Sequence, residues 1–427
     1  MVETTRLAAC VRAERGRAET LFDTLRSLSF DGIGITRPAY SAAESRVHEA
    51  LAQEARALGL EVTRDFAANT YMTRRGRDPL RPAILIGSHL DSVRQGGNFD
   101  GAAGVVGGLI ALAALDAAGV WPDCDVTVMG VRAEESAWFN VSYVGSRAAL
   151  GRLPAEALAA RRVDTGRDLA SHVAEAGGEP ARIAAGESCL EPARIRAFLE
   201  LHIEQGPLLE SEQIPVGIVT GIPGNFRHPE VRVRGEWGHV GLLRDWRRDA
   251  LLAASEFALA LDRLWSEWQQ RGREMAATIG RFGTDPALHA LTKVPGEVAF
   301  SLDVRSCVAD DLAELEGEVA RLAGDIAARR GVTFEFGPRT GVPPGPMDPE
   351  ILGGFERTAV ALGIRTRRLG SPASHDAAAF AAAGIPVGML FTRNANGSHN
   401  PAEAMRMDDL LDATAILAGW IAEQAGG

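Results

Sequence analysis

The stretch AILIGSHLDSVRQGGNFDGAAGVVGGLI, residues 83–110, contains the patterns of a strand, a turn and a helix in close succession. Ala83–Ile86 is an apolar run with the length of a buried strand. Gly101–Ala118 is rich in small apolar residues, which predicts a buried helix that allows close packing. Between these two elements lie His89, Asp91 and Asp100, so three polar side chains closely follow a buried strand.

The alternation of strands and helices continues beyond this stretch. Val126–Val131, Phe198–Ile203 and Val387–Thr392 have the composition of buried strands. Ser41 and Glu44 form a capping box before the amphipathic segment SRVHEALAQEARALG, which predicts a helix. This pattern indicates an α/β fold with a mixed, mostly parallel sheet flanked by helices.

Residues 213–338 have a different pattern and are predicted to form an inserted α+β domain. Half-exposed strands are expected at Val216–Val219, Glu230–Arg234, Met275–Phe282, Glu297–Val304 and Thr333–Phe336. Long helices are expected at Trp246–Gln269 and Ala309–Arg329. The first domain then consists of residues 1–212 and 339–427. A chain of 427 residues is long enough for two such domains.

The composition of the chain limits which binding partners and which subcellular locations are expected. The formal net charge of −11 argues against nucleic acid and anionic membranes as partners. No uncharged apolar run reaches the about 20 residues of a membrane span, and the first residues lack the apolar core of a signal peptide. The cysteines are scattered and are expected to be reduced thiols, which favours a cytoplasmic protein: Cys10, Cys124, Cys189 and Cys307.

Five residues that can bind a metal ion fall at predicted strand ends or in the segments that follow them, across the whole chain. They are His89, Asp100, Glu135, His202 and His399. Imidazole and carboxylate groups are the ligands expected for zinc or another borderline divalent ion. Five ligands exceed the need of one four-coordinate ion, but a carboxylate that bridges two ions would use them all.

Each of these residues also has a simpler interpretation. A single histidine is more often a packing or hydrogen-bonding residue than a ligand, and the adjacent pair Glu134–Glu135 would usually be solvated. The shared position near strand ends favours metal binding over these interpretations. Four other histidines lack that position and are expected to be structural or surface residues: His48, His172, His228 and His289.

Several motifs resemble those of the hydantoinase/carbamoylase amidases, a family within the dinuclear zinc superfamily of aminoacylases and carboxypeptidases. They run in family order from residue 87 to 403: GSHLDSV, GGNFDGAAGV, EES, LELHIEQGP, GHVG, PGEVAFSLDVR, SHDA and GSHNPAE. The family includes N-carbamoyl-L-amino acid hydrolases, allantoate amidohydrolases and bacterial β-ureidopropionases. The resemblance therefore implies a metal-dependent amidohydrolase.

The resemblance also implies how the five ligands are divided. His89 and His202 would bind one divalent ion, Glu135 and His399 the other, and Asp100 would bridge them. Zinc is the first expectation for both ions, and manganese, cobalt and nickel suit the same ligands.

Two further carboxylates have separate implied roles. Asp91 resembles the residue that orients His89 and fixes its tautomer. Glu134 resembles the general base, which would accept a proton from the attacking water and deliver it to the leaving nitrogen.

In this family the inserted domain, which is ferredoxin-like, acts as a lid and dimerisation domain, so a homodimer is implied. His239 resembles the lid histidine that stabilises the tetrahedral oxyanion in the partner's active site. Arg305 resembles the arginine that binds the substrate carboxylate. Gln205 resembles a substrate-side glutamine, and Thr292 stands where the family has a substrate-binding asparagine.

The substrate-side motifs depart from the family pattern at 136–139, 240–245, 292 and 371–374. Trp138, Leu242 and Leu243 are larger or more apolar than the residues they replace, which predicts a pocket for a bulkier or more apolar group than allantoate.

The expected reaction is hydrolysis of an N-carbamoyl-L-amino acid to the L-amino acid, CO2 and NH3. The enzyme alternatives are an N-acyl-amino acid amidase, an allantoate or ureido-acid amidohydrolase, and a dipeptidase. A non-catalytic metal-binding or substrate-binding protein is a third class, but the presence of Glu134 and all five ligands argues against it.

Overall fold

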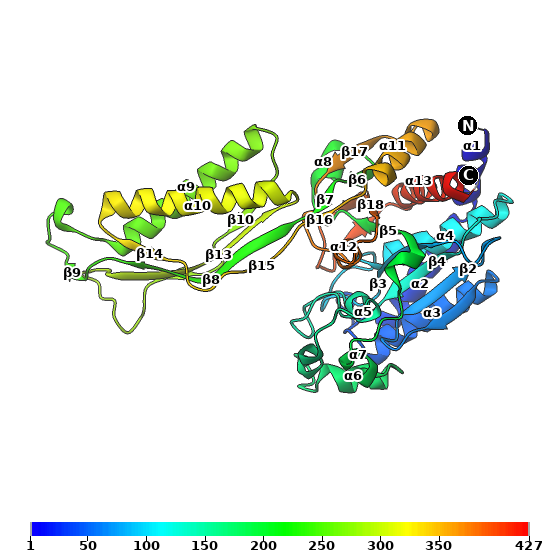
Figure 1. Ribbon diagram of the computed structural model, residues 1–427, viewed down its shortest axis with the longest axis horizontal. Coiled ribbons are helices and arrows are strands. Elements are labelled where there is room, and N and C mark those ends of the chain that lie inside the picture. Colours follow the sequence, from blue (N-terminus) through cyan, green and yellow to red (C-terminus); the bar gives the residue numbers. More distant parts are fainter. Residues whose placement is uncertain (1, 426–427) are drawn as a thin grey trace. The chain divides into compact units, whose positions relative to one another are not determined.

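A computed structural model describes residues 2–425, and the chain divides into two compact units (Figure 1). The first unit contains residues 1–220 and 346–427, and the second contains residues 221–345. The predicted insertion, 213–338, therefore begins and ends a few residues early. Val216–Val219 (β6) was wrongly expected to be a half-exposed strand of the insertion, because it is buried and pairs within the sheet of the first unit. Among residues 2–425, no helix combines the length and the apolar character needed to span a bilayer.

The first unit is built on an eight-stranded mixed sheet with the order β1-β2-β4-β3-β5-β18-β6-β17. In this order the strands are Glu61–Arg64, Thr70–Arg74, Val126–Val131, Ala83–His89, Ile195–Ile203, Val387–Thr392, Val216–Val219 and Thr366–Leu369. The central strands β4, β3, β5 and β18 are mutually parallel, whereas β2 and β6 run antiparallel to their neighbours β4 and β18. The predicted mixed, mostly parallel sheet is confirmed.

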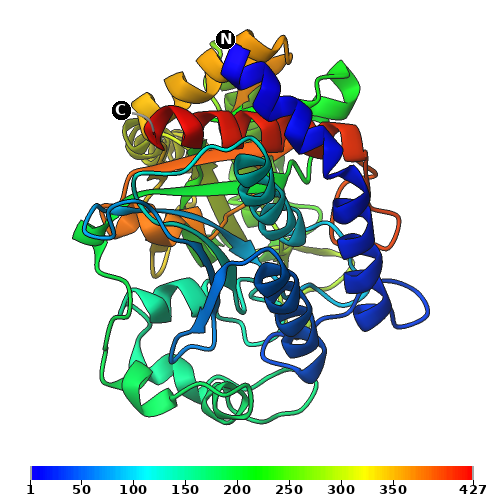
Figure 2. The ribbon, with the colours of Figure 1, turned by 90° about the vertical axis from the view of Figure 1, so that its right-hand side faces the viewer.

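Helices cover both faces of this sheet, as Figure 2 shows from the side of the first unit. The longer helices are α1 (Val2–Ala13), α2 (Arg15–Ser29), α3 (Ala42–Ala57), α4 (Ala102–Ala117), α11 (Pro349–Leu362) and α13 (Met407–Ala425). The shorter helices are α5 (Val144–Ala149), α6 (Leu169–Glu175), α7 (Pro180–Ala184), α8 (Leu208–Glu212) and α12 (Ala377–Ala382). Helix α4 packs on β3, β4 and β5, whereas α12 packs on β5 and β18, where Phe380 stacks on Phe198 with ring centroids 3.7 Å apart.

The small residues of α4 let it lie directly against the sheet. A Cβ atom added to Gly104 would lie 2.2 Å from the carbonyl oxygen of Leu201 in β5, so only glycine fits there. Ser88, near the end of β3, is the next neighbour of that position. This close approach brings the beginning of α4 next to the ends of β3 and β5.

The second unit has the connectivity β8-α9-β10/β11-β13-α10-β14 and an antiparallel sheet in the order β10-β13-β8-β14, as in a ferredoxin-like fold. Its helices are α9 (Ala250–Gln270) and α10 (Ala309–Arg330). Its strands include β8 (Gly224–Arg234), β10 (Ala276–Thr278), β11 (Phe282–Gly283), β13 (Glu297–Ser306), β14 (Thr333–Glu335) and β15 (Thr340–Val342). Besides β11, further two-residue strands are β7 (Gly221–Ile222), β9 (Gly238–His239) and β12 (Lys293–Val294). Alternate residues of β13 are buried against an apolar core that includes Phe257 and Trp268 of α9.

The substitution Gly104→Ala is expected to lower the free energy of unfolding by about 1–3 kcal/mol, because the added methyl group forces α4 away from β5. Gly353→Ala in α11 of the same unit is the control, since its Cβ would meet only the tip of Arg357 at 3.5 Å. That control is expected to stabilise by about 0.5–1 kcal/mol. Urea denaturation followed by circular dichroism measures both variants. Equal effects would contradict the close approach of α4 and β5.

Candidate functional site

The predicted ligands meet at the carboxyl edge of the central parallel strands. His89 is the last residue of β3, His202 is near the end of β5, and Glu135 follows β4. His399 follows β18 and the short strand β19 (Asn394–Ala395), and Asp100 precedes α4. Because β4, β3, β5 and β18 are adjacent and parallel, the segments that follow them converge on one place.

The first ligand group consists of His89, His202 and Asp100, all buried. The Nε2 atoms of the two histidines are 3.4 Å apart. Asp100 Oδ1 lies 3.2 Å from His202 Nε2 and 3.8 Å from His89 Nε2. These distances place three potential donor atoms around a single point.

Hydrogen bonds fix which ring nitrogen of each histidine can bind a cation. His202 Nδ1 is 2.9 Å from the carbonyl oxygen of Ile203, and His89 Nδ1 is 3.1 Å from that of Asp91. A carbonyl only accepts, so both Nδ1 atoms must carry the proton in the neutral rings. Both Nε2 atoms then present lone pairs toward each other and toward a carboxylate. A cation would accept these lone pairs and offset the negative charge of the carboxylate, so the residues fit a metal ion.

The second group consists of Asp100, Glu135 and His399. His399 Nε2 is 3.1 Å from Asp100 Oδ2 and 3.0 Å from Glu135 Oε1. Hydrogen bonds to these two carboxylates raise the pKa of His399 to about 10. Asp100 thus offers one oxygen to each group, which is the arrangement of a bridging carboxylate.

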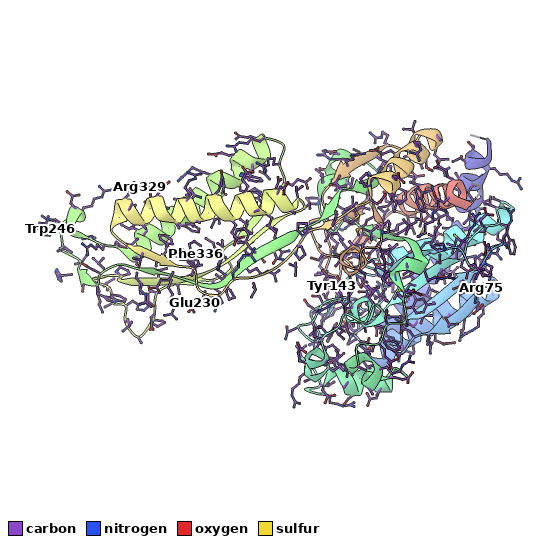
Figure 3. All side chains as sticks on the ribbon, viewed as in Figure 1. Arg75, Tyr143, Glu230, Trp246, Arg329 and Phe336 are labelled. Atoms are coloured by element: carbon purple, nitrogen blue, oxygen red, sulfur yellow. The ribbon has the colours of Figure 1, made fainter. Side chains whose placement is uncertain are left out.

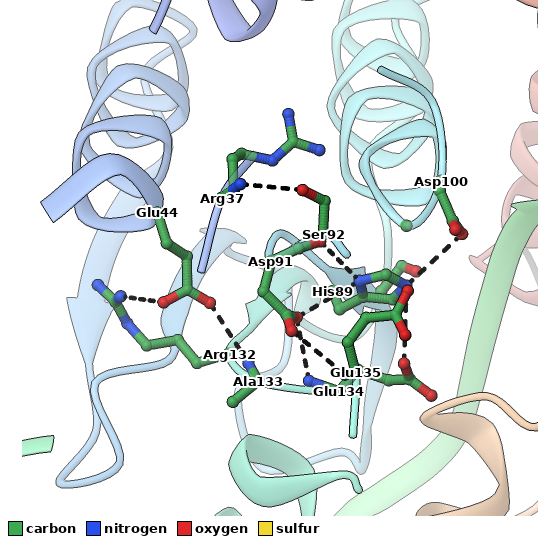
Figure 4. A network of polar contacts seen from close by, with 12 residues as sticks. Arg37, Glu44, His89, Asp91, Ser92, Asp100, Arg132, Ala133, Glu134 and Glu135 are labelled. Carbon is green, nitrogen blue, oxygen red and sulfur yellow. Dashed lines mark hydrogen bonds and ion pairs between the residues drawn. The ribbon is translucent and has the colours of Figure 1, made fainter. Parts of the chain in front are cut away.

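Asp91 joins the segment after β3 to the segment after β4 (Figure 4). Its Oδ1 and Oδ2 atoms accept the backbone N–H groups of Glu134 and Glu135, at 3.0 and 3.2 Å. Its Oδ1 is also 3.5 Å from His89 Nδ1. Asp91 therefore positions one histidine and both glutamates.

Glu134 is buried beside the first group, with its Oε2 atom 4.0 Å from His89 Nε2. Burial raises the pKa of Glu134 well above its usual range, while nearby His89 opposes the shift and nearby Glu135 adds to it. Its backbone follows Ala133, which has a φ of +53°. Such strain in a non-glycine residue is common at functional sites.

Gln205 contacts the carboxylate shared by the two groups. Its Nε2 atom lies 3.2 Å from each oxygen of Asp100, and its own φ is +61°. The side-chain carbonyl of Gln205 is buried without a hydrogen-bond partner among the described residues.

Sequence reasoning missed several buried residues behind the ligands. Glu200 accepts hydrogen bonds from Ser88 and from the backbone N–H of Ala377. The ring of His375 packs edge-on against His202, with centroids 4.4 Å apart. Glu200 lies in the motif LELHIEQGP and His375 in the motif SHDA. Only SHDA carries a signal of its own, because its polar residues directly precede a helix.

A buried arginine lies behind the segment that carries Asp91. The backbone N–H of Arg37 donates to the hydroxyl of Ser92 (Figure 4). In return, the backbone N–H of Ser92 donates to the carbonyl of Arg37. Its guanidinium has no hydrogen-bond partner among residues 2–425. Burial lowers its pKa to about 10, which still leaves it charged near Asp91 and Asp100.

Three predicted substrate residues lie in the second unit. His239 and Thr292 are neighbours there, because Val240 N–H donates to the Thr292 carbonyl and His239 pairs with Lys293. Arg305 is on β13 and binds both oxygens of Asp303, at 3.0 and 3.1 Å. His239 and Thr292 are exposed.

One of the substrate-side expectations changes in the structure. Trp138 was expected in the pocket, but only 2% of it is exposed, and its indole N–H donates to the Ser92 carbonyl. It packs in a satellite core with residues such as Tyr40 and Phe66. Leu242 and Leu243 are exposed, as is the nearby Trp246 (Figure 3).

The four histidines expected to be structural lie outside all ligand groups found among residues 2–425. His48 bonds to Thr70, His172 to Thr165, and His228 to the Phe336 carbonyl. His289 bonds to Thr284 on the surface of the second unit.

Several known proteins are similar to this chain. Residues 85–423 match peptidase family M20/M25/M40. The N-carbamoyl-L-amino-acid amidohydrolase of Paenarthrobacter aurescens is 33% identical over 408 residues, 95% of this chain and 97% of that protein. The allantoate amidohydrolase of Bacillus subtilis is 30% identical over 380 residues, 88% and 89% of the two chains. The crystal structure of a hydantoinase/carbamoylase family amidase from Burkholderia ambifaria superposes with a TM-score of 0.82, at 29% identity and 96% coverage of each chain.

Added Zn²⁺ is expected to raise the free energy of unfolding by about 2.7 kcal/mol at a hundredfold excess over its dissociation constant. Asp100→Ala should remove most of this gain, because Asp100 belongs to both ligand groups. His289→Ala, on the surface, should retain the gain. Thermal unfolding with and without the ion measures it. An unchanged zinc effect in Asp100→Ala would exclude this site as the metal centre.

Proposed function

Because this chain belongs to peptidase family M20/M25/M40 and hydrolyses linear amide bonds, we propose that it converts an N-carbamoyl-L-amino acid to the L-amino acid, CO2 and NH3. The observation that carries the proposal is the pair of ligand groups that share Asp100 beside the buried Glu134. The named activity of the Paenarthrobacter relative, over almost the whole chain, supports the choice of substrate.

Two divalent ions, zinc in the first place, are the proposed cofactors. His89, His202 and Asp100 would hold one ion, and Asp100, Glu135 and His399 the other. Bound there, the ions would polarise the scissile carbonyl and lower the pKa of a water molecule. A cation must displace the proton that His399 holds between two carboxylates, so its affinity falls as the pH is lowered.

Glu134 is the proposed general base. Its carboxylate takes a proton from the water that attacks the carbamoyl carbon and returns it to the leaving nitrogen. Asp91 supports this role because it holds the Glu134 backbone through the N–H group. The products are the free amino acid and carbamate, which decomposes to CO2 and NH3.

Residues of the second unit are proposed to bind the substrate in a homodimer. The Nδ1 atom of His239 accepts the Gly241 N–H at 3.1 Å, so the neutral ring carries its proton on Nε2. Such a ring can donate to an oxyanion. Arg305 would bind the substrate carboxylate by exchanging its bond to Asp303, and Thr292 would contact polar groups of the substrate. Gln205 of the first unit would also contact these groups.

A ureido-acid amidohydrolase is the second candidate, because the Bacillus relative is named for allantoate and matches at similar identity. The same ligands and Glu134 would serve that reaction. Only the substrate-side residues would distinguish the two.

The proposed function is tested by stripping the protein with a chelator and restoring zinc, manganese or cobalt separately. Metal-dependent release of ammonia from N-carbamoyl-L-amino acids is expected to exceed turnover of N-acetyl and N-formyl amino acids, β-ureidopropionate and allantoate. Bulky apolar side chains are expected to be preferred, because Leu242 and Leu243 are apolar and exposed beside His239. Allantoate as the best substrate would favour the second candidate, and turnover of N-acyl compounds alone would overturn both.

Glu134→Gln is expected to lower kcat by about 10²–10⁴-fold, because the amide cannot accept the proton. Its metal content should equal that of the wild type. Steady-state kinetics and elemental analysis measure the two quantities. Glu156→Gln, at an exposed position, is the control and should leave both unchanged. Loss of a metal ion in Glu134→Gln would make this residue a ligand and refute its role as base.

A further inference from the structure

Glu403 is a buried carboxylate that holds the main chain at Asp100. Only 7% of the residue is exposed. Its Oε1 atom accepts the backbone N–H groups of Phe99 and Asp100, at 2.9 and 3.2 Å. A Cβ atom at Gly97 would lie 2.0 Å from this oxygen, so the segment before Asp100 packs directly on the carboxylate.

The second oxygen of Glu403 reaches the side chain of Asp100 through one hydroxyl group. Ser398 Oγ lies 2.6 Å from Glu403 Oε2 and 2.8 Å from Asp100 Oδ2. A hydroxyl group has one hydrogen to donate, so the two carboxylates share it. Backbone and side chain of Asp100 are thus both tied to Glu403, and Ser398 directly precedes His399 in the chain.

The two ligand groups differ in how firmly the rest of the fold holds them. His89 and His202 are buried residues of the central strands β3 and β5. Glu135 and His399 lie on loops, and 48% of the His399 side chain is exposed. The φ of His399 is +60°, a strained value for this residue.

The loop that carries His399 is closed mainly by its own hydrogen bonds. Strand β19 pairs with β20 (Ala404–Met405), and Asn400 donates to the Asn396 and Ser398 carbonyls. These bonds shape the loop but do not connect it to Asp100. Within residues 398–403, three residues of the loop contact the Asp100 segment or its side chain. They are the ligand His399, Ser398 and Glu403.

From this arrangement we infer that Glu403 is a positioning residue that sets the affinity of the second ion, at Asp100, Glu135 and His399, more than that of the first. The inference rests on the proposed two-ion function. Without Glu403, the Asp100 segment loses the acceptor of its two backbone N–H groups, and only the side chain of Asp100 still contacts Ser398 and His399 of the loop. Gln205 contacts the side chains of both Asp100 and His399. His89 and His202 stay paired within the sheet. Groups that orient metal ligands in this way typically contribute 10–100-fold to affinity.

The test measures ion binding without substrate. Wild type, Glu403→Ala, Glu403→Gln and Ser398→Ala are stripped and titrated with Zn²⁺ against a chromophoric chelator, and bound zinc is counted by elemental analysis. Asp348→Ala is the matched control, because Asp348 also accepts two backbone N–H groups, but at the start of α11. Circular dichroism shows which variants fold.

The wild type is expected to bind two ions. Glu403→Ala should weaken the second by about 10–100-fold and leave the first within about threefold. Glu403→Gln keeps an oxygen for the two N–H groups, and Ser398→Ala removes only the shared hydroxyl, so each should weaken the second ion by about tenfold. Asp348→Ala should bind both ions as the wild type does. If Glu403→Ala does not fold, the other two variants decide the question.

Three outcomes overturn the inference, and each is distinguishable from the other two. A wild type that binds fewer than two ions removes the proposed two-ion function and the inference with it. A wild type that binds two, with folded variants that bind both equally well, removes the role of Glu403 alone. Equal weakening of both ions would show a general structural effect and would also overturn it.

Discussion

The carboxylate of Asp100 is the point on which this structure depends. One oxygen faces His202 and the other faces His399, so two segments widely separated in the sequence meet at one side chain. Several other carboxylates are buried nearby, including Asp91, Glu134 and Glu200. Burying so much negative charge costs a great deal of free energy unless cations offset it. The parallel strands, the glycine contact of α4 with β5 and the strained backbone near Glu134 all serve to keep these groups together.

The core of the fold and the meeting of the candidate ligands could be predicted, because the strands and the polar residues that follow them have local patterns. Val126–Val131 and Val387–Thr392 were predicted with the bounds that β4 and β18 have, since short apolar runs between polar turns define buried strands. The capping box at Ser41 was half right. Ser41 accepts the Glu44 N–H, but the Glu44 carboxylate binds Tyr40 N–H and pairs with buried Arg132. The local partner is thus one residue earlier than a capping box predicts, and a tertiary partner is added to it.

Other features could not be predicted because they depend on contacts distant in sequence. Val216–Val219 looks like a half-exposed strand alone, and only its pairing with β18 shows that it is buried. Trp138 was expected in the substrate pocket, but its indole N–H donates to the Ser92 carbonyl and its side chain packs in a core. The role of Glu403 is invisible in sequence, since its partners Phe99 and Asp100 come from the other end of the chain.

The position of β18 has a consequence for how the chain is made. This strand lies between β5 and β6 in the middle of the sheet, yet it is synthesised after the whole second unit. During synthesis β5 and β6 therefore expose unpaired apolar edges, which are prone to associate with other chains. His399 emerges after β18, so no nascent chain can hold a complete second ligand group. A chain that ends before β18 contains the first ligand group of His89, His202 and Asp100 but not the second, and the open edges of its sheet would be prone to aggregation.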